Sequence, residues 1–408
     1  MTEDAAQIPP PMNPASTPDD GQPQSYGQLP SRIRIGRTPL YVGLAVVGFV
    51  AVIILGPVFV AELSGNHGSF SLTGSMATAR VTQTATALLD GRVLVVGGAT
   101  GCATGVSCRS VASAEVYDPK TGKFSPTGSM AAARTWASAT RLLDGRVLIA
   151  GGSDGSAYLT SAEIYDPKTG KFSPTGSMTT TRGVHSATLL ADGRVLIAGS
   201  DDGSKVLDSA ELYDPTTGTF SPTGSMTVAR GSGTATLLSD GRVLIAGGHN
   251  GATVLSSAEL YAPKTGKFSP TGSMTVARAN HTATALSDGR VLIAAGDDAT
   301  LNPVASAELY DPKTGTFSQT GAMADARVNH TATALSDGRV LIAAGYDGSA
   351  ELASAEIYDP GTNMFSPTGS LVTARGVHTA TLLPDGRVLL AGGFGGSEAL
   401  ASAEVYQP

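Results

Sequence analysis

The stretch that decides the fold is residues 182–226, which read RGVHSATLLADGRVLIAGSDDGSKVLDSAELYDPTTGTFSPTGSM. Residues 185–190 alternate small and large side chains and lead into Asp192-Gly193, a dipeptide favoured in two-residue hairpin turns. Residues 194–199 return as a β-branched strand, and residues 209–215 and 219–226 each supply one more. The stretch predicts four short antiparallel strands, the first two joined by a two-residue type I′ turn.

This unit recurs seven times. An Asp-Gly-Arg turn begins at Asp90, Asp144, Asp192, Asp240, Asp288, Asp337 and Asp385. A Ser-Ala-Glu-x-Tyr segment keeps step with it and ends at Tyr117, Tyr165, Tyr213, Tyr261, Tyr310, Tyr358 and Tyr406. Four strands in a repeat of about 40–50 residues are typical of one propeller blade.

The two ends of the repeat array indicate how it closes. The last repeat stops at Pro408 without a fourth strand, whereas residues 70–74 read as a fourth strand that precedes the first repeat. An open solenoid would need capping repeats at both ends, and the sequence offers none. We therefore predict an all-β fold, a seven-bladed propeller over residues 69–408, with the N-terminal strand outermost in the last blade.

Composition agrees with an all-β chain. Of the 408 residues 51 are glycine, and glycine costs roughly 1 kcal/mol relative to alanine at a helix position. The formal net charge of −7 gives no electrostatic reason to expect nucleic acid as a partner. A helical bundle and a nucleic-acid-binding domain are both disfavoured.

The segment before the repeats predicts a membrane anchor. Residues 39–61 read PLYVGLAVVGFVAVIILGPVFVA, without a charge, long enough for one transmembrane helix. Arg32, Arg34 and Arg37 precede it, so the positive-inside rule places the N-terminus in the cytoplasm. We expect a disordered proline-rich cytoplasmic tail (1–38), a linker (62–68) and a single-pass cell-membrane protein with its propeller outside. The alternative is a cleaved signal peptide.

The repeat resembles the kelch β-propeller family. A glycine doublet follows the second strand at Gly97, Gly151, Gly247 and Gly392, and the third-strand tyrosine is present in all seven repeats. Phenylalanine stands where the family usually has tryptophan in the fourth strand. The resemblance implies a seven-bladed kelch propeller but leaves its function nearly open, because kelch propellers serve many roles. No set of nucleophile, base and acid stands out in the sequence, which favours a binding module for a protein, peptide or glycan.

Residues 377–388 are similar to a stretch of the galactose oxidase group within the kelch proteins. That resemblance implies a copper ligand at His378, but Val377 stands where the group has its axial tyrosine. A carbohydrate-active or metal-dependent enzyme with a site at the channel mouth is therefore the alternative function. A structural spacer is a third possibility. We assign no catalytic residue, metal or cofactor.

Two faces follow from the strand order. The Asp-Gly-Arg turns and the turns between third and fourth strands lie on one face, here named the uniform face because its sequence repeats almost unchanged. The loops between second and third strands and the blade-to-blade segments form the varied face. Since function concentrates in loops on a rigid scaffold, we expect binding on the varied face, with candidates His249, Tyr346 and Phe394. The alternative is that these loops differ only because little constrains them.

Further candidates lie near the predicted channel mouth. The third residue after each inner-strand arginine is Gln83, Ala137, His185, Gly233, His281, His330 or His378. Three of the histidines fall in adjacent blades, so a metal site and a local hydrogen-bonding role are both open. Trp136, the only tryptophan, is a candidate stacking surface for a sugar or peptide, or else fills the channel wall.

Each repeat also contains one arginine and one Ser-Ala-Glu glutamate at constant positions. We predict that they form buried ion pairs that hold the blades. The arginines are Arg80, Arg134, Arg182, Arg230, Arg278, Arg327 and Arg375, and the glutamates Glu115, Glu163, Glu211, Glu259, Glu308, Glu356 and Glu404. The only two cysteines, Cys102 and Cys108, lie in one loop and predict a disulfide in a chain outside the cytoplasm.

Overall fold

The computed structural model describes residues 68–103 and 107–408. The predicted tail, the predicted transmembrane helix and most of the linker lie outside these residues. Over the ranges that the structure describes, no helix has the length and apolar character needed to cross a membrane.

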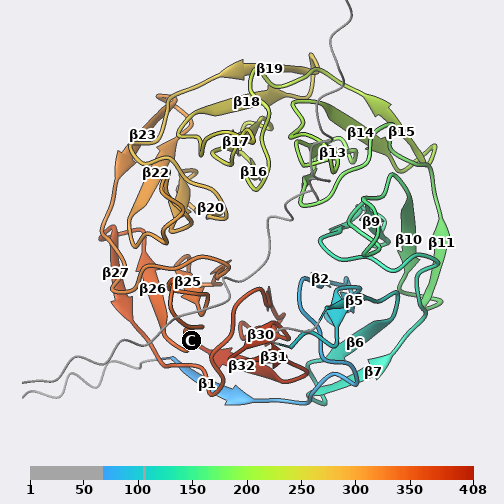
Figure 1. Cartoon of the computed structure of the whole chain (residues 1–408). Helices are drawn as coiled ribbons and strands as arrows, with labels where there is room; N and C mark the ends of the chain where they lie inside the picture. Colours follow the sequence, from blue (N-terminus) through green and yellow to red (C-terminus); the bar gives the residue numbers. More distant parts are fainter. Residues whose placement is uncertain (1–67, 104–106) are drawn as a thin grey trace, which may run out of the picture. The chain divides into compact units, whose positions relative to one another are not determined.

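Seven four-stranded antiparallel sheets surround a central axis (Figure 1). The prediction of a seven-bladed all-β propeller is confirmed. Contacts between neighbouring innermost strands run round the whole ring and close between β28 and β2. Blades 1 to 4 comprise β2 (Thr84–Ala87), β3 (Val93–Val96), β6 (Ala114–Asp118), β7 (Lys123–Pro126); β8 (Ser138–Arg141), β9 (Val147–Ala150), β10 (Ala162–Asp166), β11 (Lys171–Pro174); β12 (Ser186–Leu189), β13 (Val195–Ala198), β14 (Ala210–Asp214), β15 (Thr219–Pro222); and β16 (Thr234–Leu237), β17 (Val243–Ala246), β18 (Ala258–Ala262), β19 (Lys267–Pro270).

The remaining blades repeat this order. Blades 5 to 7 comprise β20 (Thr282–Ala285), β21 (Val291–Ala294), β22 (Ala307–Asp311), β23 (Thr316–Gln319); β24 (Thr331–Ala334), β25 (Val340–Ala343), β26 (Ala355–Asp359), β27 (Met364–Pro367); and β28 (Thr379–Leu382), β29 (Val388–Ala391), β32 (Ala403–Gln407), β1 (Ser69–Leu72). Two short hairpins, β4 (Ala99–Thr100) with β5 (Arg109–Ser110) and β30 (Phe394–Gly395) with β31 (Glu398–Ala399), lie in varied-face loops.

The residue types of each strand match its radial position. The first three residues of each innermost strand are threonine, serine or alanine, because strands crowd together near the axis. Second strands such as VLIA in β13 are fully buried, since blades cover both of their faces. Third strands bury their apolar residues together with the glutamate and tyrosine of the repeat motif.

The hydrophobic core lies between the blades. One cluster joins Leu292 and Ala294 of blade 5 to Val340, Ile342 and Tyr358 of blade 6, and equivalent clusters join the other neighbouring blades. A blade therefore has no core of its own and depends on both neighbours. This is the expected behaviour of a repeat unit that cannot bury its apolar face alone.

The prediction of a two-residue type I′ turn at Asp-Gly-Arg was wrong. The amide of Leu190 donates to the carbonyl of Arg194 at 2.8 Å, so three residues, 191–193, form the loop. Gly193 has a φ of +88°, whereas Asp192 is not among the residues of positive φ. The loop therefore has the form of a type I turn followed by a left-handed glycine, the usual three-residue hairpin.

The N-terminal strand closes the ring as predicted. β1 pairs antiparallel with β32, from Ser69 opposite Gln407 to Leu72 opposite Glu404, and becomes the outermost strand of blade 7 (Figure 1). The Phe70 ring packs on Tyr406 with centroids 4.8 Å apart, as the equivalent phenylalanine does in the other blades. Pairing strands from the two ends of the repeat array leaves blade 7 with the same four strands as its neighbours.

Candidate functional site

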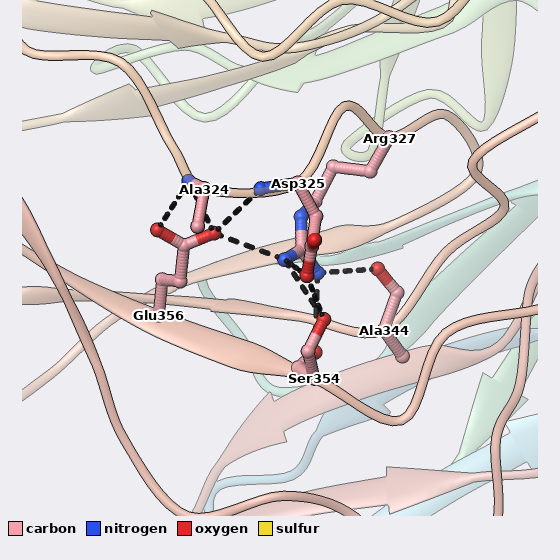
Figure 2. Close-up of polar contacts among 6 residues, drawn as sticks. All are labelled: Ala324, Asp325, Arg327, Ala344, Ser354 and Glu356. Carbon is pink, nitrogen blue, oxygen red and sulfur yellow. Dashed lines mark hydrogen bonds and ion pairs between the residues drawn. The ribbon is translucent and has the colours of Figure 1, made fainter. Parts of the chain in front are cut away.

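The site is built on a rigid frame of buried ion pairs. In blade 6 the guanidinium of Arg327 lies 3.1 Å from Glu356 and donates to the carbonyl of Ala344 and to Ser354 (Figure 2). The same carboxylate accepts the backbone amide of Ala324. Neither the guanidinium nor the carboxylate is accessible to solvent to any large extent. Charge-assisted bonds on both partners offset the cost of their burial.

Each of these arginines connects two blades. The backbone of Arg327 bonds to blade 5, donating to Val304 and accepting from Gly296, while its side chain bonds to blade 6. The predicted pairs are confirmed in all seven blades: Arg80–Glu115, Arg134–Glu163, Arg182–Glu211, Arg230–Glu259, Arg278–Glu308, Arg327–Glu356 and Arg375–Glu404. The varied face is therefore held by seven equivalent links between neighbours.

The residue two positions after each of these arginines has a left-handed backbone. Their φ values lie between +49° and +56°, and none of the seven is glycine. They are Thr82, Trp136, Val184, Ser232, Asn280, Asn329 and Val377. Left-handed φ is costly for bulky and β-branched side chains, so the surrounding frame must impose it. Hydrogen bonds from Trp136 to Thr82, from Asn280 to Ser232 and from Val377 to Asn329 link these residues from blade to blade.

We call these seven residues the mouth ring. Each directly follows a residue that bridges to the start of a varied loop, as Val328 does to Tyr346 and Gly376 to Phe394. The ring therefore lies at the inner edge of the varied face. Trp136 is 38% exposed there and available for stacking. Sequence reasoning selected only Trp136 and missed the other six, although their constant spacing from the arginines was a usable signal.

The four histidines next to the ring point between blades. The Nε2 atom of His281 lies 3.0 Å from the hydroxyl of Thr234 on the preceding blade's innermost strand. The other three make the same contact, His185 with Ser138, His330 with Thr282 and His378 with Thr331. The sequence left open a metal site and a local hydrogen-bonding role for these histidines. The contacts in the structure are those of the hydrogen-bonding role.

Burial lowers the pKa of these imidazoles, and the charge of the nearby arginine adds to the effect. The pKa falls to about 4 at His185 and to about 3 at His281, His330 and His378. The rings are therefore neutral in the folded protein at any pH near neutrality.

Stability is expected to fall between pH 7.5 and pH 5. Below 6.5 the unfolded chain protonates its histidines while the folded chain does not, so each histidine is expected to contribute a loss of up to about 2 kcal/mol at pH 5. The free energy of unfolding of His281→Gln, measured in urea, should depend less on pH than that of the parent chain, because glutamine does not titrate. Glutamine is chosen because Gln83 occupies this position in blade 1. Identical pH profiles for the two proteins would contradict the assignment.

Three blade interfaces lack this imidazole, because Gln83, Ala137 and Gly233 stand at its position. Gly233 stands at the histidine position of blade 4, and a small cavity lined by Ser186, Gly199 and Met226 lies beside it. We expect Gly233→His to fill this cavity, bond to Ser186 and raise the free energy of unfolding by about 1 kcal/mol. Urea denaturation would measure the change.

Gly241 is the matched control for that substitution. It has a φ of +83°, so Gly241→His is expected to destabilise the chain through backbone strain. A Gly233→His protein that is no more stable than the parent would show that the backbone near Ala246, 3.1 Å from the added Cβ, cannot adjust.

The varied-loop candidates take different positions. His249 and Tyr346 begin their loops and bridge to the blade-entry segments at Gly231 and Val328. The Tyr346 hydroxyl donates to the carbonyl of Gly348, and burial lowers the pKa of His249. Phe394 packs against the cluster formed by Val81, Ala99, Cys102 and Ala399. These three residues and Trp136 lie on the varied face, whereas the four inter-blade histidines lie beneath it.

A disulfide joins Cys102 to Cys108 in the first varied loop. Cys102 is buried, and Ala103 bridges to Glu398 of the last varied loop. The disulfide therefore anchors the longest loop at the junction of blades 1 and 7.

Charge is distributed unequally between the faces. The varied face bears two basic side chains, Arg109 and Lys205, and ten acidic ones, which are Asp154, Asp201, Asp202, Asp208, Asp297, Asp298, Asp325, Asp347, Glu351 and Glu398. The uniform face bears Arg141 and seven lysines, Lys120, Lys123, Lys168, Lys171, Lys264, Lys267 and Lys313, against Asp118, Asp166, Asp214, Asp311 and Asp359. Its Asp-Gly-Arg turns are neutral, because each aspartate pairs with its own arginine.

Comparison with known proteins agrees with this geometry. The Kelch motif matches residues 80–131, 138–179, 230–275 and 327–371. The chain is a kelch-repeat β-propeller. This kelch propeller is similar in structure to a novel fungal alcohol oxidase of the AA5 family in complex with copper, with a TM-score of 0.68 and 17% sequence identity, over 84% of this chain and 77% of that one. No curated protein sequence matches it.

The similarity to the copper oxidase extends to the fold alone. At the position where the resemblance implied a copper ligand, His378 is buried and its Nε2 is bonded to Thr331. Val377 precedes it, and nowhere in residues 68–103 and 107–408 do three His, Cys, Asp or Glu side chains gather as metal ligands. The residues of this kelch propeller do not fit the copper centre.

Proposed function

We propose that this chain is a membrane-anchored kelch propeller whose varied face binds an extracytoplasmic protein, peptide or glycan. The observation that carries the proposal is the difference between the two faces of one scaffold. The uniform face repeats the same turns, whereas the varied face has a different loop in each blade and displays the strained mouth ring. Variation on a rigid frame is what recognition of a specific partner requires.

The charge of the varied face narrows the class of partner. Ten acidic side chains against two basic ones favour a cationic protein or peptide, because complementary charge steers association and fixes orientation. Trp136 adds an aromatic surface on which an arginine, an aromatic side chain or a sugar can stack. The binding site of this proposal comprises the varied loops and the mouth ring.

The membrane anchor is supported by the sequence of residues 39–61 and by the three arginines before it. The chain enters the propeller at Ser69, which lies opposite Gln407 at the end of the third strand. That end of the blade belongs to the uniform face. A short linker would therefore direct the uniform face toward the membrane and the varied face outward.

Cysteine labelling on intact cells tests the orientation. Ser349→Cys and Ser336→Cys introduce one thiol on the varied and one on the uniform face of the same blade, and Cys102 and Cys108 are already joined in a disulfide. We expect a bulky membrane-impermeant maleimide to label residue 349 faster than residue 336. Equal rates would contradict the orientation, and labelling of neither residue until the cells are opened would contradict the extracytoplasmic location.

Binding is tested with the full chain in vesicles, screened against peptide and glycan arrays. We expect the strongest ligands to be cationic peptides, and Trp136→Ala and Asp297→Asn to weaken their binding several-fold. Lys313→Ala on the uniform face is the matched control and should leave it unchanged. Ligands that bind all of these variants equally would contradict a site on the varied face.

A further inference from the structure

Blades 1 and 2 carry an apolar feature on the uniform face that the other blades lack. Leu89 and Leu143 immediately precede the Asp-Gly-Arg turns of these blades and are 67% and 68% exposed, the highest values among the large apolar side chains that the structure describes. The equivalent residues of the other blades are Ala191, Ser239, Ser287, Ser336 and Pro384. The pair is therefore not a requirement of the repeat.

The two leucines border one hollow of about 370 Å³, whose wall also contains Leu189 and Arg141. Leu89 lies over Gly145 of blade 2 and Leu143 over Gly193 of blade 3, so the two side chains are held on neighbouring turns. Arg141 replaces the alanine or leucine that ends the other innermost strands, and it donates to the carbonyl of Ala87. An apolar surface with a cationic edge results.

Blades 1 and 2 are the only neighbouring blades whose outer turns both contain more lysines than aspartates, four exposed lysines against two aspartates in all. The four lysines are Lys120, Lys123, Lys168 and Lys171. Blade 4 bears Lys264 and Lys267 without an aspartate, but Ser239 stands there at the position of the leucines. Arg92, in the turn that follows Leu89, bonds to the carbonyl of Pro167 and so links that turn to the one bearing Lys168.

The chain leaves the propeller on this face. The amide of Gly369 donates to the carbonyl of Gly68, just before β1, and the uncharged residues 39–61 end only seven positions before that glycine. If residues 39–61 span a membrane, the uniform face lies within a few residues' reach of the lipid surface. Exposed leucines on the same face as an excess of lysines are the composition that binds anionic bilayers.

We infer that the uniform face docks through Leu89, Leu143 and the lysines of blades 1 and 2 on the anionic lipid surface of the membrane that holds residues 39–61. The docking rests on the proposed anchor. The leucines enter the headgroup region, and the lysines pair with lipid phosphates. The propeller is then tilted toward blades 1 and 2, and the varied face points away from the bilayer.

The test uses the full chain in vesicles of phosphatidylcholine, with or without about one third phosphatidylglycerol, that contain a headgroup-quencher lipid. A fluorophore is attached at Ala191→Cys beside the patch, at Ser336→Cys on the far side of the same face, or at Ser204→Cys on the varied face. We expect quenching at residue 191 to be at least about twofold stronger in anionic vesicles, with little at residue 204. Quenching at residue 336 should be intermediate between that at residue 191 and that at residue 204.

Two sets of variants locate the contact. Leu89→Ser with Leu143→Ser, and Lys168→Glu with Lys171→Glu, are each expected to abolish the additional quenching at residue 191. The double variant Lys264→Glu with Lys267→Glu makes the same charge change in blade 4. It should leave the additional quenching at residue 191 unchanged. Equal quenching in neutral and anionic vesicles, or no effect of the blade 1 and 2 variants, would overturn the docking.

The anchor is measured separately by flotation of the vesicles at alkaline pH. Chains that float but show no lipid-dependent quenching retain the anchor and refute the docking. Chains that do not float refute the anchor, and the docking with it. If the leucine variant instead changes the oligomeric state in light scattering while quenching is unchanged, the patch joins two copies of the chain, and the lipid proposal is overturned.

Discussion

Replacing Arg278 with methionine is expected to lower the free energy of unfolding by about 3–5 kcal/mol, because it leaves Glu308 charged and unpaired in the protein interior. Arg278 and Glu308 are both almost completely buried, 3.4 Å apart. Arg278 also donates to the carbonyls of Ala295 and Ser306, so three further acceptors, including the Ser306 hydroxyl, lose a donor. Urea unfolding of the folded propeller would measure the loss.

Two further variants serve as controls for that experiment. Arg339→Met removes an exposed arginine that pairs with Asp337, and it should cost less than about 1 kcal/mol. Adding Glu308→Gln to Arg278→Met removes the uncompensated charge while keeping an acceptor for the amides of Thr275 and Val276, so part of the stability should return. An unchanged unfolding curve for Arg278→Met would show that the pair does not hold blades 4 and 5 together.

Removing β1 is expected to have the second large effect. A chain that begins at residue 75 loses the four residue pairs with β32, the packing of Phe70 on Tyr406 and the hydrogen bond between Thr73 and Tyr117. Loss of the phenylalanine alone would cost on the order of 3 kcal/mol. The exposed edge of β32 should also pair with a second chain, so we expect both a lower melting temperature and oligomers.

A chain that begins at residue 66 is the control, because it keeps β1 and differs by only nine residues. Size-exclusion chromatography and thermal unfolding would compare the two. If both chains were monomeric and equally stable, the closure by β1 would not be what stabilises blade 7.

The fold could be read from the repeats because each requirement recurs at a fixed position. Threonine and alanine in the innermost strand, VLIA in the second and the glutamate and tyrosine of the third follow from local packing, so the sequence shows them directly. The Arg–Glu pairs were also predictable, since seven copies in constant register argue for one role. The Asp-Gly-Arg turn was misjudged because the same dipeptide suits both two- and three-residue loops, and only the pairing of Leu190 with Arg194 distinguishes them.

The candidate site was less predictable. His378 has the neighbours of a potential metal ligand in the sequence, yet its orientation depends on the threonine of another blade, 47 residues away. The mouth ring depends on backbone angles that the frame imposes on ordinary side chains such as Val377. Neither property is encoded by the types of the adjacent residues.

By itself, therefore, the sequence determined the number of blades, their strand order, the closing strand and the residues that pair inside each blade, because these depend on period and local pattern. The strand order also assigned each loop to one of the two faces, but only the tertiary structure decided which side chains of a face lie next to one another. Bringing blades 1 and 2 side by side united Leu89, Leu143 and four lysines, and closing the ring gathered the acidic loops on the opposite side. The physical reason is that a surface is formed by residues separated by whole repeats, and their proximity exists only once the blades have packed into a ring.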